Sequence, residues 1–355
     1  MSTLSTDTHL LATALVERFK NLQAGEAANW ESLPHAVPTT LKETPFEAVW
    51  YGARLLGFVP QDAGCIAHAW QAQTQRTGNF DATCWPCEAQ DFSLSPTSAS
   101  NAFAPCPASL GLYAVLPDAQ WVARMVDLGV PTVQLRFKSD NTKSIQQEVL
   151  AAVKAVEGSR THLFINDHWQ VALDAGAYGV HLGQEDMELA SLDAIRSAGL
   201  RLGLSSHGYT EMLKACAVQP SYLALGAVFP TTLKRMATAP QGLGRLAMYA
   251  RLMHGRSLVA IGGIDIERLP AVMQTGVGSA AFVRAITAAT DVSQAVAQLQ
   301  ACLTTHLQHG SSQQGDGESP VRSYVMSNVT SATSCTRPVI RSPATTGPTP
   351  SGVPV

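Results

Sequence analysis

Polar side chains follow most of the apolar strands that the sequence predicts between about residues 110 and 306. Gln134, Arg136 and Lys138 alternate at the end of the predicted strand Thr132–Arg136 and so share one face. Other chemically useful residues follow the later strands: Asn166, Asp167, Asp186, Ser205, Thr231, Lys234, Gly262, Gly263, Val283 and Arg284. If these strands form a barrel, the loops after them converge on one mouth, and the residues surround one site.

Two carboxylates, Asp167 and Asp186, lie on neighbouring loops of this predicted rim. Mg²⁺ takes one or two carboxylates from a protein and completes its shell with waters and phosphate oxygens, so the pair predicts a magnesium site. An Asp after a strand is more often a helix N-cap than a metal ligand. Taken alone, Asp167 or Asp186 would be interpreted in that way. The concentration of such groups on nearly every strand end favours the metal.

Cations and glycines complete the predicted chemistry. Arg136, Lys138 and Lys234 can neutralise a diphosphate beside the metal. Gly262 and Gly263 leave backbone N–H groups unobstructed for a second phosphate, at a position where barrels of this kind often bind one. The residue types therefore predict a diphosphate with Mg²⁺ and a separate monophosphate as ligands.

The elements that must carry these residues read as a (β/α)₈ TIM barrel, because short apolar runs alternate with stretches of helical period. The predicted strands are Leu112–Leu116, Thr132–Arg136, His162–Asn166, Gly179–Leu182, Arg201–Ser205, Tyr222–Gly226, Leu258–Gly262 and Gly278–Val283. The predicted helices are Ala119–Leu128, Lys143–Val156, Leu189–Ala198, Thr210–Val218, Ile266–Gln274 and Val292–Leu307. An open dinucleotide-binding sheet is disfavoured because no G-x-G-x-x-G follows a strand.

Three regions are expected along the 355 residues. Residues 1–109 predict a small, mainly helical extension with helices near His9–Asn21, Pro45–Leu56 and Gly64–Gln75, and with a Ser/Pro-rich linker at Ser93–Pro107. Residues 110–308 form the barrel, and the Ser/Thr/Pro/Gly-rich residues 309–355 are expected to be disordered.

The sequence gives the extension no clear function. Trp50, Tyr51 and Trp70 predict a small core packed against the barrel. Cys84 and Cys87 form a single C-x-x-C pair, which is a weak signal for metal or redox chemistry.

Composition narrows the class of protein. A net charge of −3, a pI near 6.4 and scattered basic residues predict neither a nucleic-acid partner nor a membrane partner. The residues at the start of the sequence predict no signal peptide, because charged residues interrupt the apolar stretch there, and no window approaches the roughly 18 apolar residues of a membrane span. With seven irregularly spaced cysteines, the expected location is the cytoplasm. The expected partners are small-molecule substrates, and the sequence leaves a homo-oligomer open.

The rim residues also carry a resemblance. The strings VQLRFK (133–138), LFINDHWQVALDAGAYGVHLGQEDM (163–187), LGLSSH (202–207), YLALGAVFPTTLK (222–234) and VAIGGI (259–264) resemble the thiamine phosphate synthase family over about 200 residues. The resemblance implies a TIM barrel that joins a hydroxymethylpyrimidine diphosphate to a hydroxyethylthiazole phosphate and releases pyrophosphate. A transferase of this kind needs little acid–base machinery, because the departing diphosphate leaves a cation that the aminopyrimidine stabilises.

By position, the resemblance implies roles for single residues. Asp167 and Asp186 match the Mg²⁺ ligands, and Gly263 matches the thiazole-phosphate site, with Val283 and Arg284 beside it. The residues that match pyrimidine and diphosphate contacts are Gln134, Arg136, Lys138, Asn166, Ser205, Thr231 and Lys234. Among these, Lys138, Ser205 and Lys234 are the expected catalytic residues.

Two departures leave alternatives open. The family often has Thr-x-Thr-Lys after the sixth strand, whereas this chain has Leu233 before Lys234, which weakens one expected contact and supports a non-catalytic, ligand-sensing barrel. His207 lies where a sister enzyme, a thiazole tautomerase, uses a histidine. The two Asp residues and the cations after Thr132–Arg136 favour the synthase over both.

Overall fold

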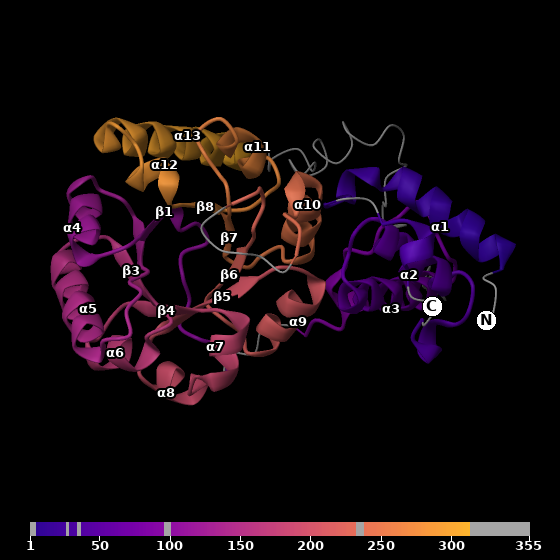
Figure 1. Ribbon diagram of the computed structural model, residues 1–355, viewed down its shortest axis with the longest axis horizontal. Coiled ribbons are helices and arrows are strands. Elements are labelled where there is room, and N and C mark those ends of the chain that lie inside the picture. Colours follow the sequence, from indigo (N-terminus) through magenta and orange to yellow (C-terminus); the bar gives the residue numbers. More distant parts are fainter. Residues whose placement is uncertain (1–4, 26–27, 34–36, 96–100, 232–237, 313–355) are drawn as a thin grey trace, which may run out of the picture.

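The structure is a computed structural model that describes residues 5–25, 28–33, 37–95, 101–231 and 238–312. Its larger part is a closed barrel of eight parallel strands, in which each strand pairs with the next and β8 pairs with β1 (Figure 1). The strands are β1 (Gly111–Leu116), β2 (Thr132–Leu135), β3 (His162–Asn166), β4 (Gly179–Leu182), β5 (Arg201–Ser206), β6 (Tyr222–Leu225), β7 (Leu258–Ile261) and β8 (Ser279–Phe282). The predicted TIM barrel is confirmed.

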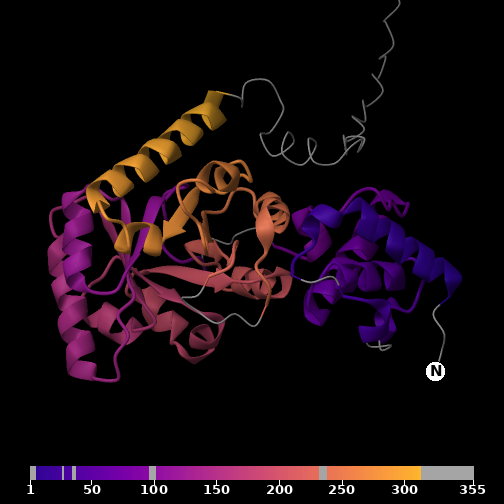
Figure 2. The ribbon, with the colours of Figure 1, turned by 45° about the horizontal axis from the view of Figure 1, so that its top comes forward.

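Helices between the strands cover the outside of the barrel (Figures 1 and 2). They are α4 (Ala119–Asp127), α5 (Thr142–Val156), α6 (Trp169–Asp174), α7 (Gln184–Leu189), α8 (Leu192–Ser197), α9 (Tyr209–Ala217), α10 (Gly242–Leu252), α11 (Leu269–Met273), α12 (Arg284–Thr287) and α13 (Val292–Ser312). The helix predicted at Leu189–Ala198 is present as α8, but it begins only at Leu192 because Ala190 is extended, with ψ 144°. The preceding helix α7 was not among the predicted ones.

Successive side chains of each strand point alternately to the outside and the inside of the barrel, so the apolar side chains form two separate clusters. Leu112, Ala114 and Leu116 of β1 belong to the large core, whereas Tyr113 and Val115 belong to a smaller cluster with residues from other strands. In that cluster Tyr113, Phe164 and Tyr222 form neighbouring aromatic contacts, with ring centroids 5.1–6.0 Å apart. This cluster fills the barrel interior, and polar groups are concentrated at the carboxyl ends of the strands.

Residues 101–109, which precede β1, lie against the opposite end of the barrel. Their carbonyl oxygens accept hydrogen bonds from side chains at or just before the starts of three strands: Ala104 from Ser221 (2.6 Å), Pro105 from Arg201 (3.3 Å) and Pro107 from Ser257 (3.0 Å). Residues 103–107 of the predicted linker Ser93–Pro107 are therefore fixed to the barrel.

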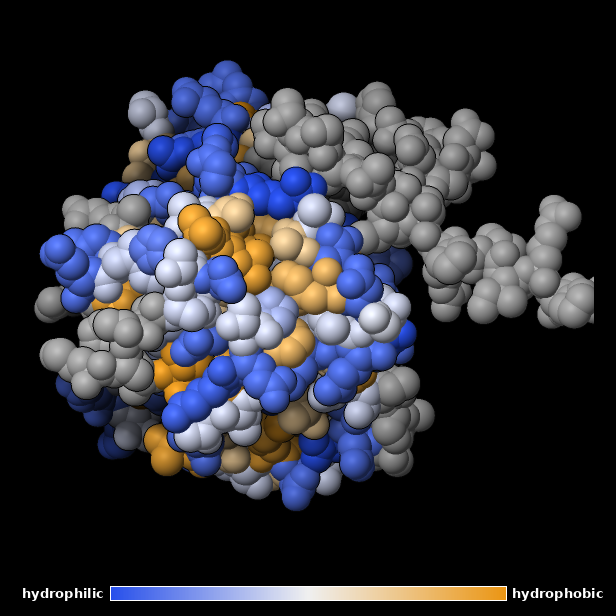
Figure 3. Space-filling view, turned by 90° about the vertical axis from the view of Figure 1, so that its right-hand side faces the viewer, coloured by the Kyte–Doolittle hydropathy of each residue, from blue (hydrophilic) through white to orange (hydrophobic). Residues whose placement is uncertain are grey.

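The N-terminal helices α1 (Thr6–Arg18), α2 (Phe46–Leu55) and α3 (Pro60–Thr77) pack around a core of their own. Trp50, Tyr51 and Trp70 are at most 2% exposed in it, and the contacts between these helices are extensive. Polar and apolar residues alternate over the described part of the face that this region turns away from the barrel (Figure 3). We call residues 5–95 the N-terminal unit.

The N-terminal unit packs on α9 and α10 of the barrel (Figure 1). The Trp85 indole N–H donates to the Tyr209 hydroxyl at 3.0 Å. The buried Arg245 guanidinium of α10 donates to the carbonyl oxygens of Leu22 and Leu56, each at 2.8 Å. Hydrogen bonds from a charged donor are stronger than those between neutral groups, so these bonds stabilise the contact between the N-terminal unit and α10.

Two sequence predictions remain outside this description. The disorder predicted for residues 309–355 falls almost wholly on residues outside the described ranges, and the division at residues 109 and 308 stays a prediction. Over the ranges that the structure does describe, no helix has both the length and the apolar character needed to cross a bilayer.

Candidate active site

The carboxyl ends of the strands surround a cavity of about 930 Å³. The predicted site residues that line it are Gln134, Arg136, Lys138, Asn166, Asp167, Asp186, Ser205, Thr231, Gly262, Gly263, Val283 and Arg284, together with His207. Lys234 and Leu233 lie outside the described residues, so the predicted contact of Lys234 and the departure at Leu233 are not located. The structure thus brings every described candidate to one cavity.

Asp167 is held at the end of β3 in an unusual conformation. Its φ is +64°, which is uncommon for a residue other than glycine. Its carboxylate forms an ion pair with Lys138, which follows β2. The helix that begins nearby, α6, has His168 at its N-cap and no side-chain cap. Asp167 is therefore not the N-cap that its position after a strand suggested.

Asp186 lies in the first turn of α7, not before the helix as the sequence suggested. Its Oδ2 accepts a hydrogen bond from the Gly183 N–H at 3.3 Å, so part of its role is to cap that helix. Burial raises the pKa of Asp186, and the neighbouring Asp167 carboxylate raises it further. A carboxylate whose negative charge is disfavoured by burial and by a second carboxylate lies at a place where a cation is favoured.

These two carboxylates fit a Mg²⁺ site of a particular kind. Among the residues that the structure describes, no group of three or more His, Cys, Asp or Glu side chains could enclose a metal. A pair of carboxylates beside an open cavity instead suits Mg²⁺, which retains waters and binds the oxygens of a phosphate substrate. The donor set therefore fits the metal when it arrives with a phosphorylated ligand.

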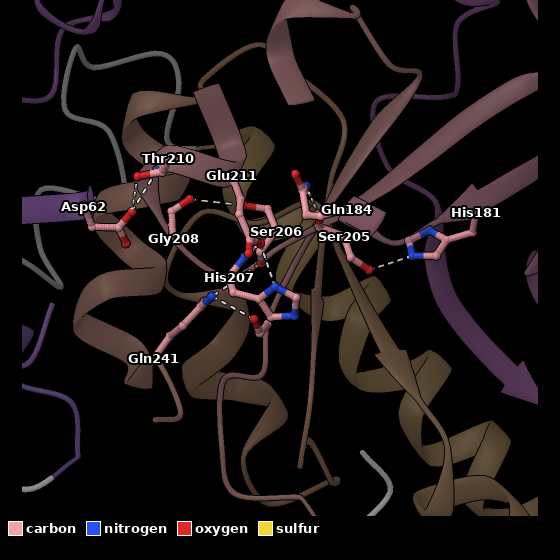
Figure 4. A network of polar contacts seen from close by, with 11 residues as sticks. Asp62, His181, Gln184, Ser205, Ser206, His207, Gly208, Thr210, Glu211 and Gln241 are labelled. Carbon is pink, nitrogen blue, oxygen red and sulfur yellow. Dashed lines mark hydrogen bonds and ion pairs between the residues drawn. The ribbon is translucent and has the colours of Figure 1, made fainter. Parts of the chain in front are cut away.

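Ser205, at the end of β5, contacts His181 (Figure 4) and through it joins a hydrogen-bonded chain in the barrel interior. Its hydroxyl lies 2.9 Å from His181 Nε2, and His181 Nδ1 lies 2.7 Å from the Tyr222 hydroxyl. Tyr222 in turn shares a hydrogen bond of 2.7 Å with Tyr113. Burial raises the pKa of both tyrosines well above the ordinary value, so both stay neutral and His181 is oriented by an uncharged partner.

His181 was not among the residues singled out from the sequence. The signal for it was present: the strand Gly179–Leu182 reads Gly-Val-His-Leu, and a histidine in an apolar parallel strand needs a polar partner. Gln134 and Asn166 are likewise buried in the barrel, where the Gln134 side-chain amide donates to Asn166 Oδ1 at 3.4 Å.

His207 follows β5 and is held by a carboxylate of α9. Glu211 Oε2 accepts the His207 backbone N–H at 2.8 Å and lies 2.6 Å from the ring Nδ1 (Figure 4). This contact fixes the ring and assigns Nδ1 as the atom that faces the carboxylate. Nε2 is then the ring atom left for a ligand in the cavity.

Gly262 and Gly263 bring the loops after β6 and β7 together. Their φ values are +107° and +64°, and a Cβ on Gly263 would lie 2.7 Å from the carbonyl oxygen of Pro230. A second cation, Arg268, lines the cavity here and donates to the Gly263 carbonyl oxygen at 2.6 Å. Sequence reasoning named Arg284 for this end of the cavity but did not find Arg268, which lies seven residues beyond the end of β7 in chain order.

Cys87 does not suit the redox or metal role considered for the C-x-x-C pair. It is a free thiol in the interior of the N-terminal unit, and burial raises its pKa, which disfavours the reactive thiolate.

Comparisons with known proteins place this geometry among related barrels. Residues 112–286 match a family model described as thiamine monophosphate synthase. The thiamine-phosphate synthase of Neisseria meningitidis serogroup A is 53% identical over 199 residues, which are 56% of this chain and 97% of that protein. That of Cronobacter sakazakii is 52% identical over 189 residues, covering 53% of this chain and 90% of the relative.

One solved structure of a protein with a similar name also matches the barrel. The thiamine phosphate pyrophosphorylase from Pyrococcus furiosus is 27% identical, with a TM-score of 0.50, and the match covers 56% of this chain and 97% of that one.

Proposed function

The chain belongs to the thiamine monophosphate synthase family, and from this premise we propose that it is a Mg²⁺-dependent thiamine-phosphate synthase. The substrates are 4-amino-5-hydroxymethyl-2-methylpyrimidine diphosphate and hydroxyethylthiazole phosphate, and the products are thiamine phosphate and pyrophosphate. The observation that carries the proposal is the distribution of these groups around one cavity: two carboxylates and Lys138 follow β2, β3 and β4, whereas Gly263, Arg268 and Arg284 follow β7 and β8, across the closed barrel.

The diphosphate belongs on the side of the carboxylates. Asp167 and Asp186 would hold Mg²⁺, which when bound neutralises the diphosphate and makes it a better leaving group. Lys138 is already paired with Asp167, so its ammonium lies where the diphosphate oxygens would meet it. Arg136 adds a second positive charge to the same cavity.

The reaction is a substitution at the pyrimidine methylene. The carbon–oxygen bond breaks, its electron pair leaves with pyrophosphate, and the aminopyrimidine ring stabilises the cation that remains. The thiazole nitrogen then donates its lone pair to the methylene and forms the new carbon–nitrogen bond. Ser205, oriented by His181, and Gln134 with Asn166 are proposed to hold the pyrimidine and its diphosphate in line with the thiazole.

The thiazole phosphate belongs on the opposite side. The backbone N–H groups at Gly262 and Gly263, with Val283 and Arg284 beside them, are proposed to bind its phosphate. Thr231 and Lys234 remain proposed diphosphate contacts. A cytoplasmic location and the participation of small molecules alone also stay predictions.

Incubation of the purified protein with both substrates and Mg²⁺ tests the proposal. The expected result is magnesium-dependent formation of thiamine phosphate with equimolar pyrophosphate. Binding of both ligands without product would instead favour the ligand-sensing barrel.

A second candidate rests on His207, whose ring is fixed by Glu211 with Nε2 left for a ligand. A thiazole tautomerase would use that nitrogen for proton transfer. Interconversion of thiazole phosphate tautomers without the pyrimidine diphosphate, abolished by His207→Gln, would identify this activity.

A further inference from the structure

The start of α9 receives its cap from a residue far away in the chain. Asp62, in the first turn of α3, is 5% exposed, and its Oδ1 accepts hydrogen bonds from the Thr210 N–H at 2.9 Å and the Thr210 hydroxyl at 2.7 Å (Figure 4). Thr210 is the second residue of α9. An acceptor at this point satisfies an N–H that has no partner within the helix, and a negative charge there is favoured by the helix dipole.

The residue that would ordinarily supply this cap has no side chain. Gly208 is the N-cap of α9, and its backbone is extended, a conformation that any residue adopts. A Cβ on Gly208 would lie 2.0 Å from Asp62 Oδ2, and the three nearest atoms to it all belong to Asp62. The carboxylate of the N-terminal unit therefore occupies the space of the missing N-cap side chain.

The capped helix directly follows the part of β5 that lines the cavity. The Ser206 hydroxyl donates to the Gly208 carbonyl oxygen at 3.2 Å, and Glu211 of α9 holds His207. Ser205 lies next to them and contacts His181. Asp62 is thus connected, through Gly208 and the first turn of α9, to the segment Ser205–His207.

The N-terminal unit is anchored beside this contact, so Asp62 has a defined position. Phe92 stacks on Tyr209, the first residue of α9, with centroids 5.1 Å apart and planes 5° from parallel. Trp85 donates to the same tyrosine. The family match begins at residue 112, so the anchor is an addition to the barrel that the family shares.

We propose that Asp62 is a positioning residue, through which the N-terminal unit sets the conformation of Ser205–His207 and so the binding of the pyrimidine diphosphate. The effect on binding of the pyrimidine diphosphate rests on the proposed synthase function. The effect on the conformation of Ser205–His207 does not depend on which reaction the protein catalyses.

Four variants of the full chain test it. Asp62→Ala removes the cap, whereas Asp62→Asn keeps an acceptor at Oδ1. The double variant Asp62→Ala with Gly208→Asp returns a cap from the N-cap position, into space that the first change vacates. Thr8→Val is the matched control, because Thr8 is a buried, hydrogen-bonded residue of the same unit whose partners are Ser5, Thr44 and Glu47.

Amide hydrogen exchange of residues 205–215 is the first measurement. Asp62→Ala is expected to raise the exchange rate there by about fivefold, the factor that corresponds to the loss of one helix cap. Asp62→Asn and the double variant should exchange like the wild type, and Thr8→Val should leave this segment unchanged.

The steady-state kinetics are the second measurement. Asp62→Ala should raise KM for the pyrimidine diphosphate by about fivefold, with a smaller change in kcat. The double variant should recover most of that loss. A purely structural role of Asp62 would lower the melting temperature without this difference between KM and kcat.

Equal exchange in Asp62→Ala and Thr8→Val, or a double variant that recovers neither exchange nor KM, would overturn the inference. If Asp62→Ala does not fold, folding of the double variant supports the cap and its failure to fold refutes it. A wild-type protein that forms no thiamine phosphate would refute the proposed function, and hydrogen exchange would still decide the role of Asp62.

Discussion

Lys138 and Asp167 form an ion pair between the loops that follow β2 and β3. The pair places a cation against one of the two carboxylates proposed to hold Mg²⁺. A bound metal and a diphosphate would redistribute this contact, with the carboxylate turning to the metal and the ammonium to the phosphate oxygens. The same two residues would thus contact both halves of the proposed metal–diphosphate complex.

Asp167→Asn should lower kcat/KM on the order of 100-fold and raise the Mg²⁺ concentration needed for half-maximal activity, because an amide is a weaker ligand of a hard cation. Steady-state assays over a Mg²⁺ titration measure both effects. Asp118→Asn is the control: Asp118 also follows a strand but caps α4 by accepting the Trp121 N–H at 2.8 Å, a task that Asn performs equally well. An Asp167→Asn enzyme of full activity would refute the metal assignment.

Pyrophosphate should stabilise the protein only together with Mg²⁺. At a hundredfold excess over its Kd, a ligand adds about 2.7 kcal/mol to the free energy of unfolding, which corresponds to a rise of about 5–10 °C in melting temperature for a domain of this size. Differential scanning fluorimetry with pyrophosphate, in Mg²⁺ and in EDTA, makes the comparison. A similar rise in EDTA would show that the carboxylates bind no metal with this ligand.

Tyr222→Phe should destabilise the protein by about 1–3 kcal/mol, because the hydroxyl that contacts both Tyr113 and His181 is lost in a buried place. KM for the pyrimidine diphosphate should rise as well, since His181 orients Ser205. Tyr113→Phe removes the Tyr113–Tyr222 contact but leaves the one to His181, so it should affect stability less and KM little. Thermal denaturation of the two variants measures the loss of stability, and steady-state kinetics measure KM. Equal KM values in Tyr222→Phe and Tyr113→Phe would contradict a role of the hydrogen-bonded chain in orienting Ser205.

Gly263→Ala should raise KM for the thiazole phosphate and lower stability by about 1–3 kcal/mol, because both the positive φ and the contact with the Pro230 carbonyl oxygen oppose a Cβ. Gly129→Ala is the matched control. Gly129 has a similar φ of +69°, but a Cβ there meets no atom within 4 Å. If the two variants lose the same stability and neither changes KM, the crowding at Gly263 has no part in phosphate binding.

Arg245→Met should destabilise the protein by about 2–4 kcal/mol, since the Leu22 carbonyl oxygen loses the guanidinium donor and the Leu56 carbonyl oxygen keeps only the Ala24 N–H. Arg251→Met, an exposed change on the same helix, should leave the free energy of unfolding nearly unaltered. Denaturant unfolding measures both. Comparable losses in the two variants would mean that Arg245 does not anchor the N-terminal unit.

The sequence predicted all eight strands, because a parallel barrel strand is a short apolar run between turns and that signal is local. It failed for helices whose local signals conflict with the fold. The predicted helix Leu189–Ala198 begins too early, because the chain is extended at Ala190. The helix Gly242–Leu252 was not predicted, since it contains two glycines in its first turn.

For the site, a rule about barrel topology allowed residues from distant strands to be grouped at one mouth. That rule says which strand ends meet but not which side chains contact one another. The ion pair of Lys138 with Asp167 and the chain from Ser205 to Tyr113 therefore required coordinates. The cap by Asp62 had no signal at all, because Asp62 and Thr210 are 148 residues apart and neither is unusual in its own segment.

The anchoring of the N-terminal unit on α9 and α10 also bears on how the chain is synthesised. Trp85 leaves the ribosome 124 residues before Tyr209, its hydrogen-bond partner. At typical translation rates this interval is on the order of 10 s, far longer than a small helical domain needs to fold. The face that later covers α9 has no partner throughout that interval, and it is covered only when the fifth and sixth repeats of the nascent barrel emerge.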